Sequence, residues 1–326
     1  MRRIRTLACA WAMGSVVVVA AGLPSQAADT SPADTLLDRA RAAVASHEFA
    51  GTVRVGWRTA SGMEWKNVPV RAVDGGLRLA GGDLVEDDGR AWLRGRAGWA
   101  TLWSDTRAPE APSVTAKYHA RIGKGPDVAD RPTRALTIER GGHVVERYAF
   151  DRAEGFVLRR VRYGDDGRVN ASMSFVQLGP VLDARGSLQT PRVDGSAPQP
   201  MDRPPSDAHR RVGAGFVLVG AQRVGEETQL QYSDGVFTAS VFTRDGVIDR
   251  DALPAGGADV KFDGVTVRRY RTAGGTVLTW ESRGRTYTCI TDASDAEQRA
   301  ILASLGSDDD GWTDAVRFVT SPFSWF

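Results

Sequence analysis

Residues 146–178, ERYAFDRAEGFVLRRVRYGDDGRVNASMSFVQL, contain three successive β-strands and the two turns that join them. Apolar and polar residues alternate around Tyr148 and Phe150, and the alternation stops at residues 152–155. It resumes after this first turn and stops again at residues 165–167, where a glycine that tolerates positive φ follows two aspartates. The third strand alternates in the same way, with apolar residues at Val169, Ala171, Met173 and Phe175. This period of two predicts an antiparallel meander with one buried face.

A second pair of motifs lies downstream, where residues 230–235 read LQYSDG and residues 240–242 read SVF. Together with the meander, these motifs resemble the RseB/MucB family, which consists of secreted regulators of envelope-stress sigma factors. In that family the meander ends the first domain and a tyrosine-serine-aspartate-glycine strand lies in the second. The two matches occur here in the family's order and at about its spacing.

The resemblance implies both a fold and a function. It implies that the first domain is LolA-like, an unclosed barrel with a hydrophobic cavity, and that the second domain helps to hold a partner. It also implies binding to the extracytoplasmic part of a transmembrane anti-sigma factor, which is thereby shielded from proteolysis. The resemblance further implies that mislocalised envelope lipid or lipoprotein releases such a regulator.

The N-terminus has the pattern of an export signal. Arg2, Arg3 and Arg5 form a basic segment, residues 7–23 are apolar, and small residues precede a cleavage site after Ala27. We therefore predict a signal peptide at residues 1–27 and an extracytoplasmic protein, in the periplasm or the cell-envelope space. The alternative is that the segment is retained as a membrane anchor.

Charge and cysteine content restrict the partners of the exported chain. Removing the three arginines of the signal leaves 39 basic against 40 acidic residues, so no excess of positive charge favours nucleic-acid binding. Cys9 lies in the signal, and Cys289 is then the single cysteine of the mature chain. Cys289 lies on an alternating strand, which favours a buried thiol over a reactive or intermolecularly paired one.

Composition divides the mature chain into two domains. A first domain is predicted at residues 28–180, a linker at 181–208, a second domain at 209–306 and an aromatic tail at 307–326. The linker has few large apolar residues and contains five prolines, namely Pro191, Pro198, Pro200, Pro204 and Pro205. The tail either packs back on a domain or contacts a membrane or partner.

The first domain is predicted to start with a helix, because Ser31 can cap it, Pro32 suits its first position and Asp34 favours its positive end. Strands are predicted next at residues 51–58, 63–73, 76–79, 90–93, 99–103, 114–122 and 135–139. One short helix cannot cover so many strands. We therefore predict an open, curved half-barrel over the helix.

The second domain is predicted to be smaller. Its strands are expected at residues 215–220, 228–233, 236–243, 265–270, 276–282 and 285–291. A helix follows, with Ser294 and Glu297 forming a capping box and Gly306 ending it. The fold class is thus α+β and mainly antiparallel β, with a half-barrel domain and a smaller sheet that carries one C-terminal helix.

The sequence offers little for catalysis, and we predict neither enzymatic activity nor a metal or cofactor site. The four histidines, among them His143, lack the spacing of metal ligands. A nucleophile elbow and a phosphate loop are absent from the sequence. Ser233 precedes Asp234 and Gly235, the pair expected to reverse the chain in a hairpin.

Five tryptophans crowd the first half of the first domain, and they are the ligand-binding candidates: Trp57, Trp65, Trp92, Trp99 and Trp103. They either fill a core or line an apolar cavity for acyl chains, because such pockets have apolar walls with few polar groups. Trp57 and Trp65, on neighbouring strands, are the leading candidates. The partner-binding candidates lie on the second domain's hairpin, at Tyr232, Asp234, Phe237 and Phe242.

The sequence and its resemblance thus predict a secreted, non-catalytic regulator that binds a transmembrane anti-sigma factor and responds to lipid or lipoprotein. The rival is a soluble carrier of lipid or lipoprotein, and a hydrolase dependent on Ser233 or His143 is a distant third. Homo-oligomerisation stays open.

Overall fold

The computed structural model describes residues 31–73, 76–79, 84–87, 90–95, 98–104, 112–180, 199–213, 215–224, 227–248, 250, 253, 256–272 and 275–306. The predicted signal peptide, the predicted aromatic tail and residues 181–198 of the predicted linker lie outside the described residues. No helix in the described part of the chain is long and apolar enough to cross a membrane.

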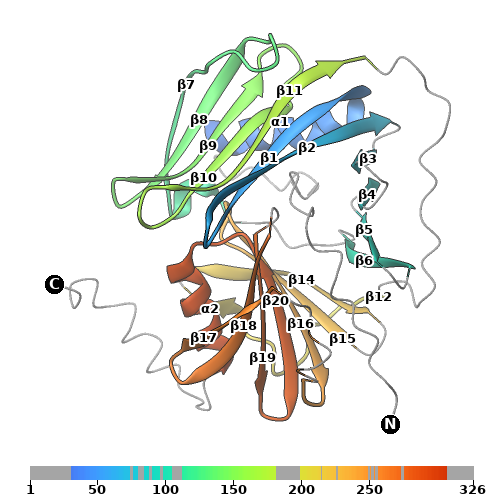
Figure 1. Ribbon diagram of the computed structural model, residues 1–326, viewed down its shortest axis with the longest axis vertical. Helices are drawn as coiled ribbons and strands as arrows, with labels where there is room; N and C mark the ends of the chain where they lie inside the picture. Colours follow the sequence, from blue (N-terminus) through green and yellow to red (C-terminus); the bar gives the residue numbers. More distant parts are fainter. Residues whose placement is uncertain are drawn as a thin grey trace.

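The first domain is one curved, 11-stranded sheet with helix α1, Pro32–Ser46, on its concave side (Figure 1). Its strands lie in the order β6-β5-β4-β3-β2-β1-β11-β10-β9-β8-β7, so β1 pairs with β11 in the middle of the sheet. All pairs are antiparallel, as the predicted meander requires. The strands are β1 Phe49–Thr59, β2 Gly62–Val73, β3 Gly76–Leu79, β4 Leu84–Asp87, β5 Arg90–Gly95, β6 Gly98–Ser104, β7 His119–Lys124, β8 Thr133–Arg140, β9 His143–Asp151, β10 Val157–Tyr163 and β11 Val169–Gly179.

Helix α1 begins where the sequence predicts. The hydroxyl of Ser31 accepts a hydrogen bond from the Asp34 N–H at 3.2 Å, and Pro32 occupies the first turn, where its missing donor is not needed. Leu36 and Leu37 are buried against the sheet. There the ring of Phe49 stacks on that of Phe156 at 5.2 Å and meets the edge of that of Phe175 at 5.8 Å. Burial of this apolar face holds the helix in place.

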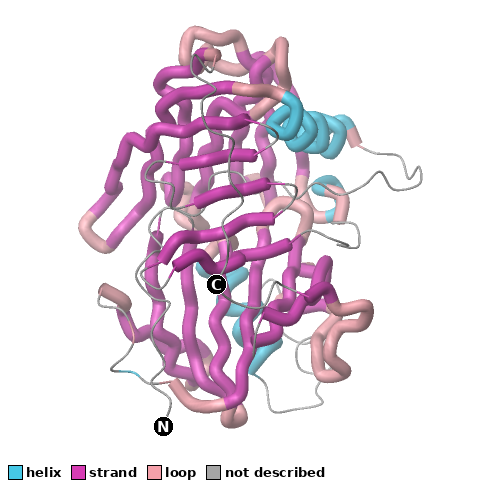
Figure 2. The backbone as a smooth tube through the Cα atoms, turned by 90° about the vertical axis from the view of Figure 1, so that its right-hand side faces the viewer, coloured by secondary structure: helices cyan, strands magenta, loops and turns pink. Residues whose placement is uncertain are grey.

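The second domain is a nine-stranded antiparallel sheet with helix α2, Asp295–Gly306. Turning the molecule by 90° shows the strands of both sheets, with the two α-helices well apart from each other (Figure 2). The strand order is β12-β14-β15-β16-β20-β19-β18-β17, and β13 pairs with β14. The strands are β12 Gln199–Pro200, β13 Arg211–Val212, β14 Phe216–Val224, β15 Glu227–Ser233, β16 Thr238–Asp245, β17 Ala258–Phe262, β18 Val265–Thr272, β19 Gly275–Ser282 and β20 Arg285–Thr291.

The fold class predicted from the sequence is confirmed, and several local details differ. Residues 114–122 start as a 3-10 helix, η3 Val114–Ala116, before β7 begins at His119. Strands β4, β13 and β17 were not predicted: β4 and β13 are too short for a pattern, whereas β17 does alternate, with Ala258, Val260 and Phe262 on one face, and this signal was missed. The second sheet begins at Gln199, inside the range predicted as linker, since Gln199 pairs with Arg223.

Candidate functional site: a polar interface between the domains

The two domains meet through a short segment of the first domain, residues 112–118, which leads into β7. Its Ser113 Oγ and the N–H of Val114 donate to the carboxylate of Asp34 at the start of α1, at 2.5 and 2.9 Å. The next residues, Lys117 and Tyr118, reach the second domain instead. One segment thus contacts both the helix of the first domain and the sheet of the second.

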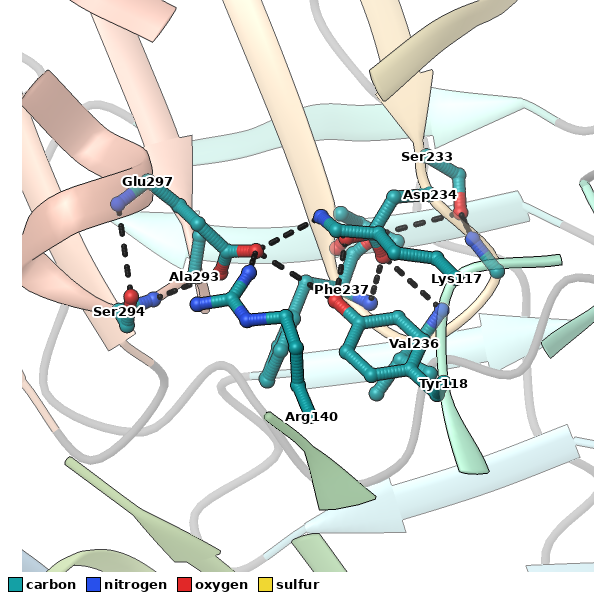
Figure 3. Close-up of polar contacts among 12 residues, drawn as sticks. Lys117, Tyr118, Arg140, Ser233, Asp234, Val236, Phe237, Ala293, Ser294 and Glu297 are labelled. Atoms are coloured by element: carbon teal, nitrogen blue, oxygen red, sulfur yellow. Dashed lines mark hydrogen bonds and ion pairs between the residues drawn. The ribbon is translucent and has the colours of Figure 1, made fainter. Parts of the chain in front are cut away.

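The carboxylate of Asp234 is the centre of the interface (Figure 3). Its Oδ1 accepts the N–H groups of Val236 at 3.1 Å and Phe237 at 2.8 Å, which closes the turn between β15 and β16. Its Oδ2 accepts the hydroxyl of Tyr118 at 2.5 Å and also the ammonium of Lys117. The side chain has no exposed surface. Asp234 therefore shapes its own turn and binds the first domain.

Glu297 on α2 is the second carboxylate of the interface. Its Oε1 accepts the Lys117 ammonium at 2.8 Å and the guanidinium of Arg140 at the end of β8. Its Oε2 lies 3.3 Å from the N–H of Ser294, and the Ser294 hydroxyl accepts the Glu297 N–H, so the predicted capping box is confirmed. Glu297 thus belongs to the capping box of α2 and also pairs with two cationic side chains of the first domain.

The charges at this site balance, with two carboxylates against Lys117 and Arg140. Burial of charge is costly unless each group is paired and hydrogen-bonded, which is the case here. Burial also raises the pKa of the Tyr118 hydroxyl, and the negative charges of Glu297 and Asp234 raise this pKa further. Tyr118 therefore stays protonated and remains a donor to Asp234.

The two backbones approach closely at the same place. Gly235 has φ of +93°, in the left-handed region that glycine adopts without strain. A Cβ at this position would collide with the carbonyl oxygen of Pro112 in the first domain. The residue after Asp234 must therefore be small for the domains to meet.

A second charged cluster joins the sheets beside the first. Arg160 donates to buried Glu146 at 2.5 Å on the neighbouring strand, while Arg162 donates to Asp292 of the second domain at 2.8 Å. Asp292 in turn accepts the N–H of Thr238 at 2.7 Å. The Arg162 guanidinium also lies over the ring of Phe237, 5.8 Å from its centroid. The concave face of the first sheet is therefore polar where the second domain covers it.

The structure does not bring the two leading tryptophans together. Trp57 lies on the concave face with Val55 and packs against the core. Trp65 pairs directly with Gly56 and so lies on the opposite face, where its side chain is 47% exposed and Arg54 covers its ring. One cavity cannot be lined by both. The other three candidates lie on β5 and β6 with side chains outside the described residues: Trp92, Trp99 and Trp103.

The predicted partner-binding residues lie mostly in the domain interface or the core. Asp234 contacts the first domain as described above, and Phe237 is buried with its ring 6.2 Å from that of Tyr118. Tyr232 is also buried, and its hydroxyl donates to the carbonyl of His209 at 3.1 Å. Phe242 lies one strand position from buried Val241, on the other face of the sheet, and is half-buried.

The described residues offer no catalytic constellation at this site. The Ser233 hydroxyl donates to the Phe237 carbonyl at 3.1 Å and accepts the N–H of Gly235, so it is committed to the turn. Within the described ranges, no cluster of three or more histidine, cysteine or acidic side chains could hold a metal ion. Cys289 is buried, and burial raises the pKa of its thiol to about 12. The site can bind and position, but it offers no activated nucleophile.

Sequence reasoning found Asp234 and Glu297 for local reasons, as a turn residue and a helix cap. It missed their partners, Lys117, Tyr118 and Arg140, which lie more than 90 positions away along the chain. Lys117 is one of only four lysines in the mature sequence, but rarity alone does not indicate a buried ion pair.

The architecture defines a class: two-domain, mainly antiparallel β proteins in which an open half-barrel contacts a smaller sheet with one helix. A crystal structure of MucB has this fold. It aligns with a TM-score of 0.51 at 20% identity, over 85% of this chain and 98% of that chain. The predicted resemblance to the RseB/MucB family is therefore confirmed at the level of the fold.

Two further solved structures align more loosely. A complex of MucA and MucB from Pseudomonas aeruginosa has a TM-score of 0.48 at 18% identity, over 83% of this chain and 97% of that chain. A putative outer membrane lipoprotein-sorting protein domain from Vibrio parahaemolyticus has a TM-score of 0.20 at 11% identity, over 44% of this chain and 89% of that chain. No protein-family model matches the chain, and no curated protein matches its sequence.

Proposed function

We propose that this chain is an exported, non-catalytic regulator that binds the outer domain of a transmembrane anti-sigma factor. The observation that carries the proposal is the MucB fold, which extends over both domains and 85% of the chain. MucB itself has been crystallised with MucA. The motif at residues 146–178 covers β9, β10 and β11 of the first sheet, and the motif at residues 230–235 ends β15 and begins the turn to β16 in the second.

The domain interface supports a binding protein over an enzyme. Complementary charges join the two domains there, and the hydroxyl of Ser233 beside Asp234 is committed to the β15–β16 turn. A protein with two domain arrangements responds to any ligand that prefers one of them. If the anti-sigma factor binds the arrangement that these ion pairs hold, a ligand that favours their separation lowers its affinity by linkage.

We also propose that this ligand is lipid or lipoprotein and that it approaches the concave face of the first sheet. Trp57 lies there and packs against the hydrophobic core. The same face turns polar toward Arg160 and Arg162, whose partner Asp292 belongs to the second domain. An acyl chain that displaced core contacts on this face would act on the interface without touching the partner.

The test is a pull-down with the mature chain, residues 28–326, from solubilised membranes of the native host. We expect a single-pass membrane protein with an anti-sigma-like cytoplasmic segment, recovered with the wild-type chain. Recovery of lipids or acylated proteins alone would refute the proposal and identify the chain as a carrier. The control is Gly235→Val, whose side chain would collide with Pro112 and displace the second domain. A membrane protein that this variant recovers equally well is adsorbed and not specifically bound.

A further inference from the structure

Strand β7 is one of the two edges of the first sheet, opposite β6 in the strand order. Among the described strands it pairs only with β8, and it lies at the outer end of the half-barrel (Figure 1). Five of its six residues are exposed, and a Cβ added at Gly123 would meet no atom within 4 Å. An exposed edge strand presents unpaired N–H and C=O groups, which can pair with another extended chain.

The register shows which peptide groups are unpaired. The Gly125 N–H donates to the Thr133 carbonyl at 3.2 Å, just after Lys124 pairs with Arg134, and the pairing continues through β7 without a bulge. In an antiparallel pair, alternate residues direct both peptide groups to the partner strand. The odd-numbered residues of β7 therefore bond β8, and the peptide groups of Ala120, Ile122 and Lys124 point away from the sheet.

Ile122 is the exposed end of an otherwise buried row. It lies opposite Leu136, which lies opposite Tyr148 on the next strand, and both of these are buried. Ile122 itself is 40% exposed. A further strand beside β7 would place a side chain opposite Ile122 and continue the apolar row by one position.

The charged side chains of this edge are basic. β7 itself carries His119, Arg121 and Lys124 and no acidic residue. Arg121 forms an ion pair with Glu139 on β8, although its own side chain stays 62% exposed. Lys124 lies opposite exposed Arg134, and in the described part of the chain no ion pair neutralises either of them.

We propose that β7 binds an extended, acidic segment of the partner's outer domain, which adds to the first sheet as a further strand. This inference rests on the proposed function. The registered positions define the segment: an acidic residue opposite Arg121, an apolar residue next to it opposite Ile122, and a second acidic residue opposite Lys124. Backbone hydrogen bonds from Ala120, Ile122 and Lys124 supply affinity, and these side chains supply selectivity.

The first test removes one outward donor. Proline lacks an N–H, and an edge strand accepts it where that group points to solvent, so Ile122→Pro keeps the pairing of β7 with β8. We expect Ile122→Pro to weaken binding of the outer domain recovered in the pull-down by at least about tenfold, the effect of losing ~1.4 kcal/mol. Ile122→Val, which keeps the N–H and an apolar side chain, should bind like the wild type.

A second variant tests which residues of β7 direct their peptide groups toward β8. Arg121→Pro removes an N–H that bonds β8, so it should lower the melting temperature, whereas Ile122→Pro should leave it nearly unchanged. If both substitutions lowered the melting temperature equally, the assignment of outward peptide groups to Ala120, Ile122 and Lys124 would be wrong. The proposed strand addition at β7 would then be wrong as well.

Amide hydrogen exchange, followed by NMR, observes the added strand directly. In the free chain the amides of Ala120, Ile122 and Lys124 should exchange fast and those of Arg121 and Gly123 slowly. The outer domain should slow the three fast amides, and 0.5 M salt should reverse this by screening the ion pairs.

The outcomes separate the two claims. If the wild-type chain does not bind the outer domain, the proposed function fails and the strand addition fails with it. If the wild type binds while Ile122→Pro binds equally well and the three amides stay fast, only the strand addition is overturned. Slowing of these amides by a second copy of the chain, with no outer domain present, would also overturn it in favour of a dimer.

Discussion

The carboxylate of Asp234 has two structural roles, one for each of its oxygens. One oxygen closes the β15–β16 turn and the other accepts donors from Lys117 and Tyr118 across the domain interface. An aspartate before a glycine predicts a turn, and this part of the site could be read from the sequence. The second role could not, because it depends on residues that only the folded chain brings near.

The dual role of Asp234 predicts a large effect for a nearly isosteric change. Asp234→Asn keeps an oxygen for the turn but leaves Lys117 with one carboxylate, so we expect the free energy of unfolding to fall by about 1.5–3 kcal/mol. The matched control is Asp245→Asn on β16, where the carboxylate is 92% exposed and pairs with Arg285. An exposed pair of this kind contributes less than about 1 kcal/mol. Equal losses in urea unfolding would contradict the role assigned to Asp234.

The placement of Trp57 and Trp65 predicts different effects on lipid binding. Trp57→Ala removes a large apolar side chain from the concave face and should weaken binding of a fluorescent fatty acid at least about tenfold, an effect of ~1.4 kcal/mol. Trp65→Ala changes the opposite face and should leave that binding unchanged. A titration in which Trp65→Ala is the more damaging substitution would exclude the concave face as the ligand site.

At the scale of elements, most of the fold follows from local signals. Period-two alternation and Gly-containing turns locate the hairpins, including the β8–β9 turn, where Gly141 and Gly142 both have positive φ. Ser31 and the capping box at Ser294 locate the starts of the two α-helices. Two exceptions have physical reasons: β4 has only four residues, two of them acidic, and η3 forms where Ser113 and Val114 bond the start of α1.

The contact between η3 and α1 predicts a dependence on pH. Burial alone would raise the pKa of Asp34, but hydrogen bonds from Ser113, Ser31 and the Val114 N–H outweigh it, and the pKa is lowered. A carboxyl whose pKa is lower in the folded state stabilises the fold above its unfolded pKa, about 3.9. That stabilisation is lost as pH falls through the folded pKa.

We therefore expect Asp34→Asn to lower the free energy of unfolding at pH 7 by about 1 kcal/mol, a discounted value because the site is partly exposed. The difference from the wild type should shrink below pH 4, where the wild-type carboxyl also becomes neutral. Chemical denaturation across pH 3–7 measures it, with Asp38→Asn on the same helix as control. A difference that stays constant with pH would contradict this assignment.

At the scale of the whole molecule, the arrangement of the two domains is what the sequence hides. Arg140 and Glu297 are 157 positions apart, and Arg162 and Asp292 are 130 apart. Each of these side chains alone resembles an ordinary solvated charge. The fold class could be predicted from patterns, but the interface depends on complementarity between surfaces that no local pattern encodes.

The interface predicts that two substitutions separate the domains without unfolding them. Replacing Lys117 and Arg140 together by methionine leaves Asp234 and Glu297 buried without a cation, which is strongly unfavourable. We expect thermal unfolding to divide into two transitions and the radius of gyration in X-ray scattering to increase, while far-ultraviolet circular dichroism stays the same. The control is Arg121→Met with Lys124→Met, which removes the same charges from the exposed edge. If the interface variant still unfolded in one transition at the wild-type temperature, contacts other than these ion pairs would hold the domains together.

Protease shielding measures directly whether the chain protects the outer domain of its partner. The purified outer domain of the membrane protein from the pull-down is digested with a broad-specificity protease, with and without the mature chain at equal concentration. We expect the outer domain to survive much longer with the wild-type chain, and we expect the double variant at Lys117 and Arg140 to shield it less. Digestion at the same rate with and without the wild-type chain would contradict a regulator that acts by binding this partner.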